Sequence, residues 1–138
     1  MTKKSTTDKI QSSKAFNKAK NKASEYATDA EKLNSLIDKA SEKAESRRNG
    51  PLTEVWDSLM ACFRLLRAYA KRSYTKIPWQ SLLLIITSVV YFVMPVDLIP
   101  DFIAGLGFTD DAVLLAWTMK AVKSDIDDFK TWEERQEA

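Results

Sequence analysis

The chain has 138 residues, with 21 Lys and Arg against 19 Asp and Glu and no histidine. This length allows one domain plus an appendage, and without histidine the commonest general base and metal ligand is absent. The single cysteine, Cys62, excludes an intrachain disulfide and any zinc site built from several cysteines.

Charge is distributed unevenly along the chain. Residues 1–50 carry twelve Lys and Arg against seven Asp and Glu, and residues 51–76 carry five against two. Residues 77–138 reverse this balance, with four basic and ten acidic residues. The asymmetry indicates that the N-terminal half meets an anionic surface. Nucleic acid is not expected as a partner, because the basic residues form no recognised module and the C-terminal half is acidic.

Residues 1–13 are polar and are predicted to be a disordered tail without a cleavable signal peptide. Residues 14–48 are predicted to form one amphipathic helix, because small or apolar residues recur at alternating intervals of three and four. These residues are Phe16, Ala19, Ala23, Tyr26, Ala30, Leu33, Ile37, Ala40 and Ala44. Since most of them are alanines, a homo-oligomeric coiled coil would be weak. The favoured interpretation is a helix that docks on its own domain or lies on a surface.

The triplet Asn49-Gly50-Pro51 is predicted to end this helix, because glycine permits a left-handed cap and proline cannot continue the hydrogen-bond ladder. A second amphipathic helix is expected from Leu52. Its C-terminal end carries five cations, and three aromatic residues accompany it. These are Arg64, Arg67, Lys71, Arg72 and Lys76, with Trp56, Tyr69 and Tyr74. The combination favours an interfacial position on an anionic membrane leaflet, and the alternative is a core-facing helix with a basic outer face.

Residues 77–96 are twenty uncharged, mostly apolar residues. As a helix they would be roughly 30 Å long, about the hydrocarbon thickness of a bilayer, so they are predicted to be a transmembrane segment with the N-terminus in the cytoplasm of a bacterial inner membrane. The alternative is a soluble bundle with this segment as the buried central helix. Residues 102–122 are not expected to span alone, because Asp110 and Asp111 lie near their centre, but they could enter partly as the second arm of a hairpin.

Four aspartates follow the apolar segment: Asp97, Asp101, Asp110 and Asp111. The favoured interpretation is structural, with the carboxylates capping turns and helix starts. The alternatives are a site for a hard cation such as Mg²⁺ or Ca²⁺, since these metals prefer oxygen ligands, or a proton-binding cluster. No other cofactor is predicted.

Residues 91–112 resemble the signature of the YkvA-like family, a small, mostly bacterial domain of unknown function. The matching residues are Tyr91, Pro95, Asp97, Leu98, Ile99, Pro100, Asp101, Leu106, Gly107, Asp110, Asp111 and Ala112. The resemblance extends over about residues 69–130 and implies a membrane-associated helical domain without an established activity. Within it, Tyr91, Pro95, Pro100 and Gly107 are expected to shape the motif.

The sequence as a whole predicts an all-α protein. It would comprise the tail at 1–13, the heptad-patterned helix at 14–48, a helical hairpin or bundle membrane domain at 52–130 and an acidic tail at 131–138. The predicted function is that of a non-catalytic membrane adaptor or regulator, which engages an unknown protein partner through its N-terminal helix. The competing hypothesis is a cation- or proton-responsive membrane component that uses the four aspartates.

Overall fold

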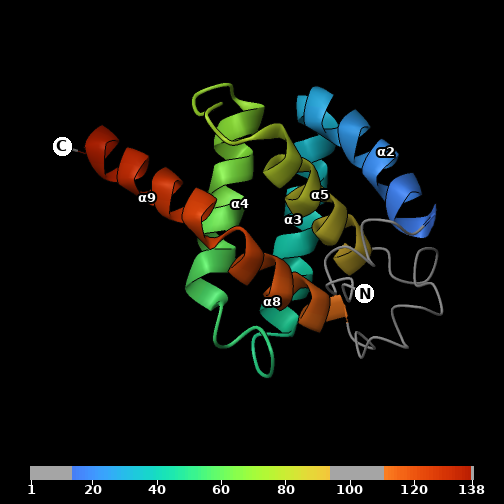
Figure 1. Cartoon of the computed structure of the whole chain (residues 1–138). Coiled ribbons are helices and arrows are strands. Elements are labelled where there is room, and N and C mark those ends of the chain that lie inside the picture. The colour runs from blue at the N-terminus through green and yellow to red at the C-terminus, as the bar shows by residue number, and fades with distance from the viewer. Residues whose placement is uncertain (1–13, 94–110, 138) are drawn as a thin grey trace, which may run out of the picture.

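The computed structural model describes the backbone of residues 14–93 and 111–137, and the side chains of residues 21–93 and 112–136. These residues form six α-helices and no strand, which confirms the all-α prediction for the described ranges (Figure 1). The helices are α2 (Lys14–Thr28), α3 (Ala30–Ser46), α4 (Trp56–Ala70), α5 (Trp79–Val93), α8 (Asp111–Ala121) and α9 (Lys123–Glu137). The predicted tail at 1–13 lies outside the described residues.

The helix predicted over residues 14–48 is divided in two at Asp29. Asp29 has extended backbone angles, φ −126° and ψ 104°, and its side chain accepts a hydrogen bond from the Lys32 amide at 3.1 Å. This is an N-cap, which satisfies one of the free amides at the start of α3. The break interrupts the heptad pattern, because Ala30 is exposed whereas Leu33 is fully buried. The two helices therefore pack independently on the same bundle instead of forming one rod.

Helix α5 lies at the centre of the bundle and contacts α2, α3 and α8. Every residue from Ile85 to Phe92 is buried, including the polar Thr87 and Ser88. Within the described ranges, no helix combines the length and the apolar character needed to cross a membrane. Over residues 79–93 the arrangement is the buried central helix of the alternative interpretation.

The segment between α3 and α4 is a turn, as predicted from its glycine and proline. Gly50 has φ +92°, a left-handed conformation that glycine adopts without a Cβ penalty. Helix α4 then begins at Trp56, four residues later than Leu52, because residues 51–55 form turns instead of a helical ladder. Leu52 and Val55 are nevertheless buried and belong to the common core.

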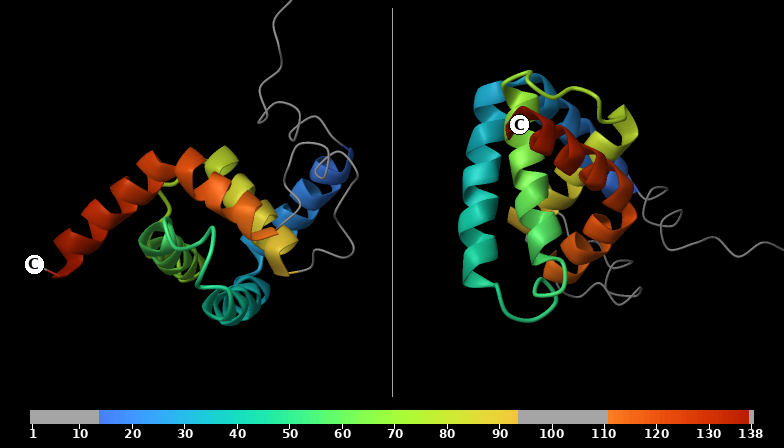
Figure 2. Two further views of the ribbon diagram at one scale, coloured as in Figure 1. Left: turned by 90° about the horizontal axis from the view of Figure 1, so that it is seen from below. Right: turned by 90° about the vertical axis from the view of Figure 1, so that its left-hand side faces the viewer.

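Helices α8 and α9 cover α5 and α4 respectively, and the C-terminal turns of α9 project beyond the bundle (Figures 1 and 2). Helix α8 is joined to α5 by a buried hydroxyl pair, in which the Ser88 and Thr118 oxygens are 2.6 Å apart. Thr118 donates its own proton to the Leu114 carbonyl at 3.0 Å, so Ser88 is the donor within the pair. The two hydroxyls thus link α5 to α8 across an apolar interface. Each donates a hydrogen bond, so neither is buried without a partner, which would cost free energy.

Candidate functional site

The connection between α4 and α5, residues 71–78, ends α4 with a tight turn. Arg72 has φ +63°, and the amides of Ser73 and Tyr74 both donate to the Ala68 carbonyl, at 3.0 and 3.3 Å. A left-handed conformation costs a residue with a Cβ roughly 1–2 kcal/mol. The helix end is therefore held in a strained but hydrogen-bonded turn, and the Arg72 guanidinium lies 5.3 Å from the centroid of the Tyr69 ring.

Three cations and one tryptophan are exposed on this connection and on the first residue of α5. We call them the basic end; it comprises Lys71, Arg72, Lys76 and Trp79. Trp79 is 48% exposed and is the large hydrophobic side chain that stands out on the described surface. None of the three cations makes an ion pair with another described residue, and residues 71–80 contain no acid. The basic end thus offers positive charge that no described acidic side chain neutralises, together with the exposed amphipathic ring of Trp79.

The other cations predicted to face an anionic surface have protein partners. Arg64 donates two hydrogen bonds to Glu133, at 2.8 and 3.0 Å, and Arg67 donates to Asp38 at 2.6 Å. These pairs join α4 to α9 and to α3, over sequence separations of 69 and 29 residues. Of the five predicted cations, two are thus engaged between helices and three remain on the basic end.

Tyr74 points into the bundle, although the sequence suggested it as an interfacial ring. Its ring centroid lies 5.1 Å from that of Phe129 and 5.2 Å from that of Trp132, and these two rings of α9 stack at 5.6 Å. Burial raises the pKa of the Tyr74 hydroxyl, and the nearby Asp128 and Asp125 carboxylates raise it further. Tyr74 therefore anchors the α4–α5 connection against α9 and leaves Trp79 as the exposed ring.

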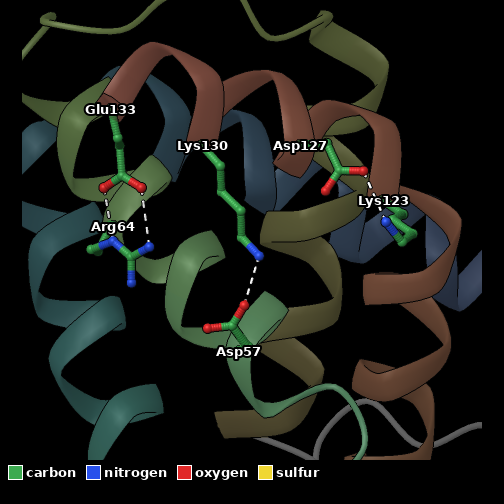
Figure 3. A network of polar contacts seen from close by, with 6 residues as sticks. All are labelled: Asp57, Arg64, Lys123, Asp127, Lys130 and Glu133. Carbon is green, nitrogen blue, oxygen red and sulfur yellow. Dashed lines mark hydrogen bonds and ion pairs between the residues drawn. The ribbon is translucent and has the colours of Figure 1, made fainter. Parts of the chain in front are cut away.

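A network of ion pairs fastens α9 to α4 (Figure 3). Beside the Arg64–Glu133 pair, Lys130 of α9 donates to Asp57 of α4 at 2.7 Å, and this bond lowers the pKa of the Asp57 carboxyl. A third pair, Lys123 with Asp127 at 2.9 Å, lies within α9. The predicted acidic tail at 131–138 thus includes one carboxylate, that of Glu133, which helps to hold α9 against α4.

The lone cysteine and the motif tyrosine are both buried. Cys62 is fully buried, and burial raises the pKa of its thiol to about 12, so the thiol stays protonated and weakly nucleophilic near neutral pH. Burial likewise raises the pKa of Tyr91 to about 12, and neither the Tyr91 hydroxyl nor the Thr87 hydroxyl has a hydrogen-bond partner among the described residues. Thr87 and Tyr91 are four residues apart and share one face of α5.

Most of the predicted aspartate cluster and motif lies outside the described residues: Asp97, Asp101, Asp110, Pro95, Pro100 and Gly107. Asp111 is the first residue of α8, but its side chain is likewise outside the description. Among the described residues, no three His, Cys, Asp or Glu side chains are grouped to hold a metal ion. The cation site and the capping roles therefore stay predictions.

Lys43 of α3 contacts the C-terminal end of α5, and the sequence analysis did not single it out. Its ammonium donates to the Phe92 carbonyl at 2.5 Å and stands 5.0 Å from the centroid of the Phe92 ring. A cation at the last carbonyls of a helix is favourable, because these carbonyls carry partial negative charge. The only signal in the sequence was a lysine on the apolar side of α3, which is too common to be diagnostic.

These features define a class for the described residues: an all-α bundle built around an uncharged helix that is buried over most of its length, with an exposed basic end. Residues 81–117, which cover most of α5 and α8, match the model of DUF1232, a family described as proteins of unknown function. The chain carries a DUF1232 domain and is homologous to the "Uncharacterized membrane protein YkvA" of Bacillus subtilis (strain 168), with 37% identity over 70 residues. The resemblance predicted from residues 91–112 is therefore confirmed.

The aligned segment is 51% of this chain and 66% of the Bacillus protein, so the two share a domain and not their full lengths. No solved structure matches the chain significantly. The relative's name places it at a membrane but assigns it no activity.

Proposed function

We propose that this protein is a non-catalytic adaptor that attaches to the cytoplasmic face of a bacterial inner membrane through its basic end. The observation that carries the proposal is the 48% exposure of Trp79 next to three cations without ion-pair partners among the described residues. Tryptophan prefers the membrane–water interface, because its ring is apolar and its N–H is polar. The relative named a membrane protein supports the location.

The charges on the basic end suit reversible attachment. A lysine or arginine near an anionic leaflet contributes about 1 kcal/mol, so Lys71, Arg72 and Lys76 together supply about 3 kcal/mol. Insertion of Trp79 adds an apolar contribution, and the two signals act together, as stable surface binding requires. Attachment of this kind weakens as salt screens the charges.

We propose no catalytic step, for two reasons that concern the available side chains. The sequence contains no histidine, and its one thiol has a pKa of about 12. The partner-binding element that we propose is α9, whose C-terminal turns project beyond the bundle (Figure 2). Its exposed residues there include Glu134, Arg135 and Gln136, which suits a polar contact with another protein.

Sedimentation of the purified protein with phosphatidylglycerol–phosphatidylcholine vesicles tests the attachment. We expect saturable binding that requires the anionic lipid, and about a thirtyfold loss of affinity in Lys71→Gln/Lys76→Gln, which corresponds to about 1 kcal/mol for each charge. Trp79→Ala should weaken binding without changing its dependence on salt. The matched control is Lys120→Gln/Arg135→Gln, which removes the same charge from α8 and α9. Equal binding of the two double variants would contradict the proposal.

A further inference from the structure

A groove with a volume of about 260 Å³ lies between α2 and α3, and Val93 of α5 also lines it. Its rim carries Lys22 from α2 and Lys32 and Lys39 from α3, with Glu25 as the single acid that lines it. The residues of the basic end are not among those that line it. The chain changes direction at Asp29, so α2 and α3 diverge from this break and both contact α5 (Figure 1).

The groove concentrates positive charge that the described part of the chain does not neutralise. All four charged side chains are exposed, and none of the three lysines has an ion pair among the described residues. Three lysines and one glutamate leave a net charge of +2 around a small cavity. Like charges held together without counter-ions repel one another, so a dianion in the groove would relieve this repulsion.

The floor of the groove is apolar. Leu36 is 3% exposed, and Val93 and Tyr26 are partly buried where they line the cavity. A purely hydrophilic anion would leave this floor unused, whereas a ligand with a short apolar portion would cover it. The volume lies slightly below the usual range for small-molecule sites, roughly 300–1,000 Å³, so the ligand is small.

We propose that the α2–α3 groove binds a phosphate monoester that carries a short apolar group. A phosphate monoester has a charge of about −1.5 to −2 at neutral pH, which matches the net charge of the groove. Lysine ammoniums bind phosphate as mobile point charges, whereas the planar fork of arginine binds carboxylate or phosphate at two points. The ligand is either the headgroup of a monoester lipid or a water-soluble phosphate ester.

Isothermal titration of the full chain with two monoesters tests the proposal and separates the two sources. The probes are hexyl phosphate and dihexanoyl phosphatidic acid, both kept below their micelle concentrations, with hexyl sulfate as a control of equal apolar length and single charge. We expect both monoesters to bind with one-to-one stoichiometry and hexyl sulfate to bind more weakly. Tighter binding of the phosphatidic acid would assign the groove to a lipid, and equal binding would assign it to a soluble ester.

Two variants locate the binding. Lys32→Gln/Lys39→Gln removes two rim charges and should weaken hexyl phosphate binding at least about tenfold, since hydrogen bonds to charged groups contribute about 1.5–3 kcal/mol. Ser35→Trp leaves every charge in place but fills the cavity, and it should abolish binding. All three side chains are exposed, so the fold should be retained, which circular dichroism checks.

Phosphate binding in the groove does not require membrane attachment by the basic end, and variants at the two sites distinguish the two kinds of binding. Lys71→Gln/Lys76→Gln should bind hexyl phosphate like the wild type, and Lys32→Gln/Lys39→Gln should bind phosphatidylglycerol vesicles like the wild type. The absence of saturable monoester binding would overturn the proposal. So would unchanged binding by both groove variants, or hexyl sulfate binding as tightly as hexyl phosphate.

Discussion

Arg64 of α4 and Glu133 of α9, 69 residues apart in the sequence, form a two-point ion pair with nitrogen–oxygen distances of 2.8 and 3.0 Å. The pair lies beside the Tyr74–Phe129–Trp132 cluster, so charge and aromatic packing hold α9 at neighbouring positions. The aromatic rings supply most of the attachment, because Phe129 is fully buried whereas Arg64 is half exposed.

Loss of the ion pair and loss of the aromatic packing should therefore lower the free energy of unfolding by different amounts. In a double-mutant cycle of Arg64→Ala and Glu133→Ala, we expect a coupling of about 0.5–1 kcal/mol in the free energy of unfolding, as for exposed ion pairs. Phe129→Ala should cost about 3–5 kcal/mol, because it leaves a cavity under α9. Urea denaturation measures both. A coupling energy larger than the cost of Phe129→Ala would show that charge holds the helix.

Acid stability should depend on Asp57. Its carboxyl pKa is lowered from 3.8, mainly by the hydrogen bond from Lys130. A lowered folded-state pKa stabilises the fold above the unfolded value, and this contribution is lost as the pH falls through the folded value. We therefore expect the wild type to lose melting temperature more steeply than Asp57→Asn below about pH 4. Lys130→Met should show the same shallow dependence as Asp57→Asn, and a steep dependence in either variant would contradict the assignment.

Tyr91 should respond to removal of its hydroxyl in the opposite direction to most core residues. The hydroxyl is buried without a described partner, so Tyr91→Phe should leave stability unchanged or raise it by about 1 kcal/mol. Burial raises the pKa of Tyr91 from 10.0 to about 12, so the unfolded chain loses the phenol proton first and the free energy of unfolding falls as the pH rises from 10 toward 12. Between pH 10 and pH 12 the melting temperature should therefore fall less steeply for Tyr91→Phe than for the wild type. A loss of stability at neutral pH would reveal a partner for the hydroxyl.

The aspartates outside the described residues can be tested by cation and by substitution together. If they cap turns, Asp97→Asn should be tolerated, because asparagine also caps, and Asp97→Ala should cost about 1 kcal/mol. If they bind a cation, both substitutions should be damaging, and Mg²⁺ or Ca²⁺ should raise the melting temperature of the wild type only. We expect the capping outcome. Thermal melts with and without each cation distinguish the two hypotheses.

Local signals in the sequence predicted the elements well. The turn at Asn49-Gly50-Pro51 appears where expected, because a left-handed glycine followed by proline excludes a continuing helix. The break at Asp29 was missed, although aspartate is a strong N-cap. An unbroken heptad pattern outweighed this local signal, and the pattern alone does not distinguish one helix from two that bury the same face.

The sequence pattern also left two alternatives open for the uncharged helix α5 and for the cations that precede it. Composition established that residues 77–96 need an apolar environment, but a bilayer and a protein core satisfy that need equally, and only the contacts with α2, α3 and α8 distinguish them over residues 79–93. Likewise, the sequence showed five cations near this helix. Which are paired depends on Glu133 and Asp38, which lie far along the chain.

The sequence by itself thus determined that the protein is helical, where its glycine turn falls, that part of it resembles the YkvA-like family, and that basic and acidic residues are segregated. The tertiary structure decided that Trp79 and not Tyr74 is exposed, and that three lysines from two helices line one groove. The reason is physical. Helix propensity and turn chemistry act between residues a few positions apart, whereas exposure, ion pairing and cavities depend on distant segments that meet only when the chain has folded.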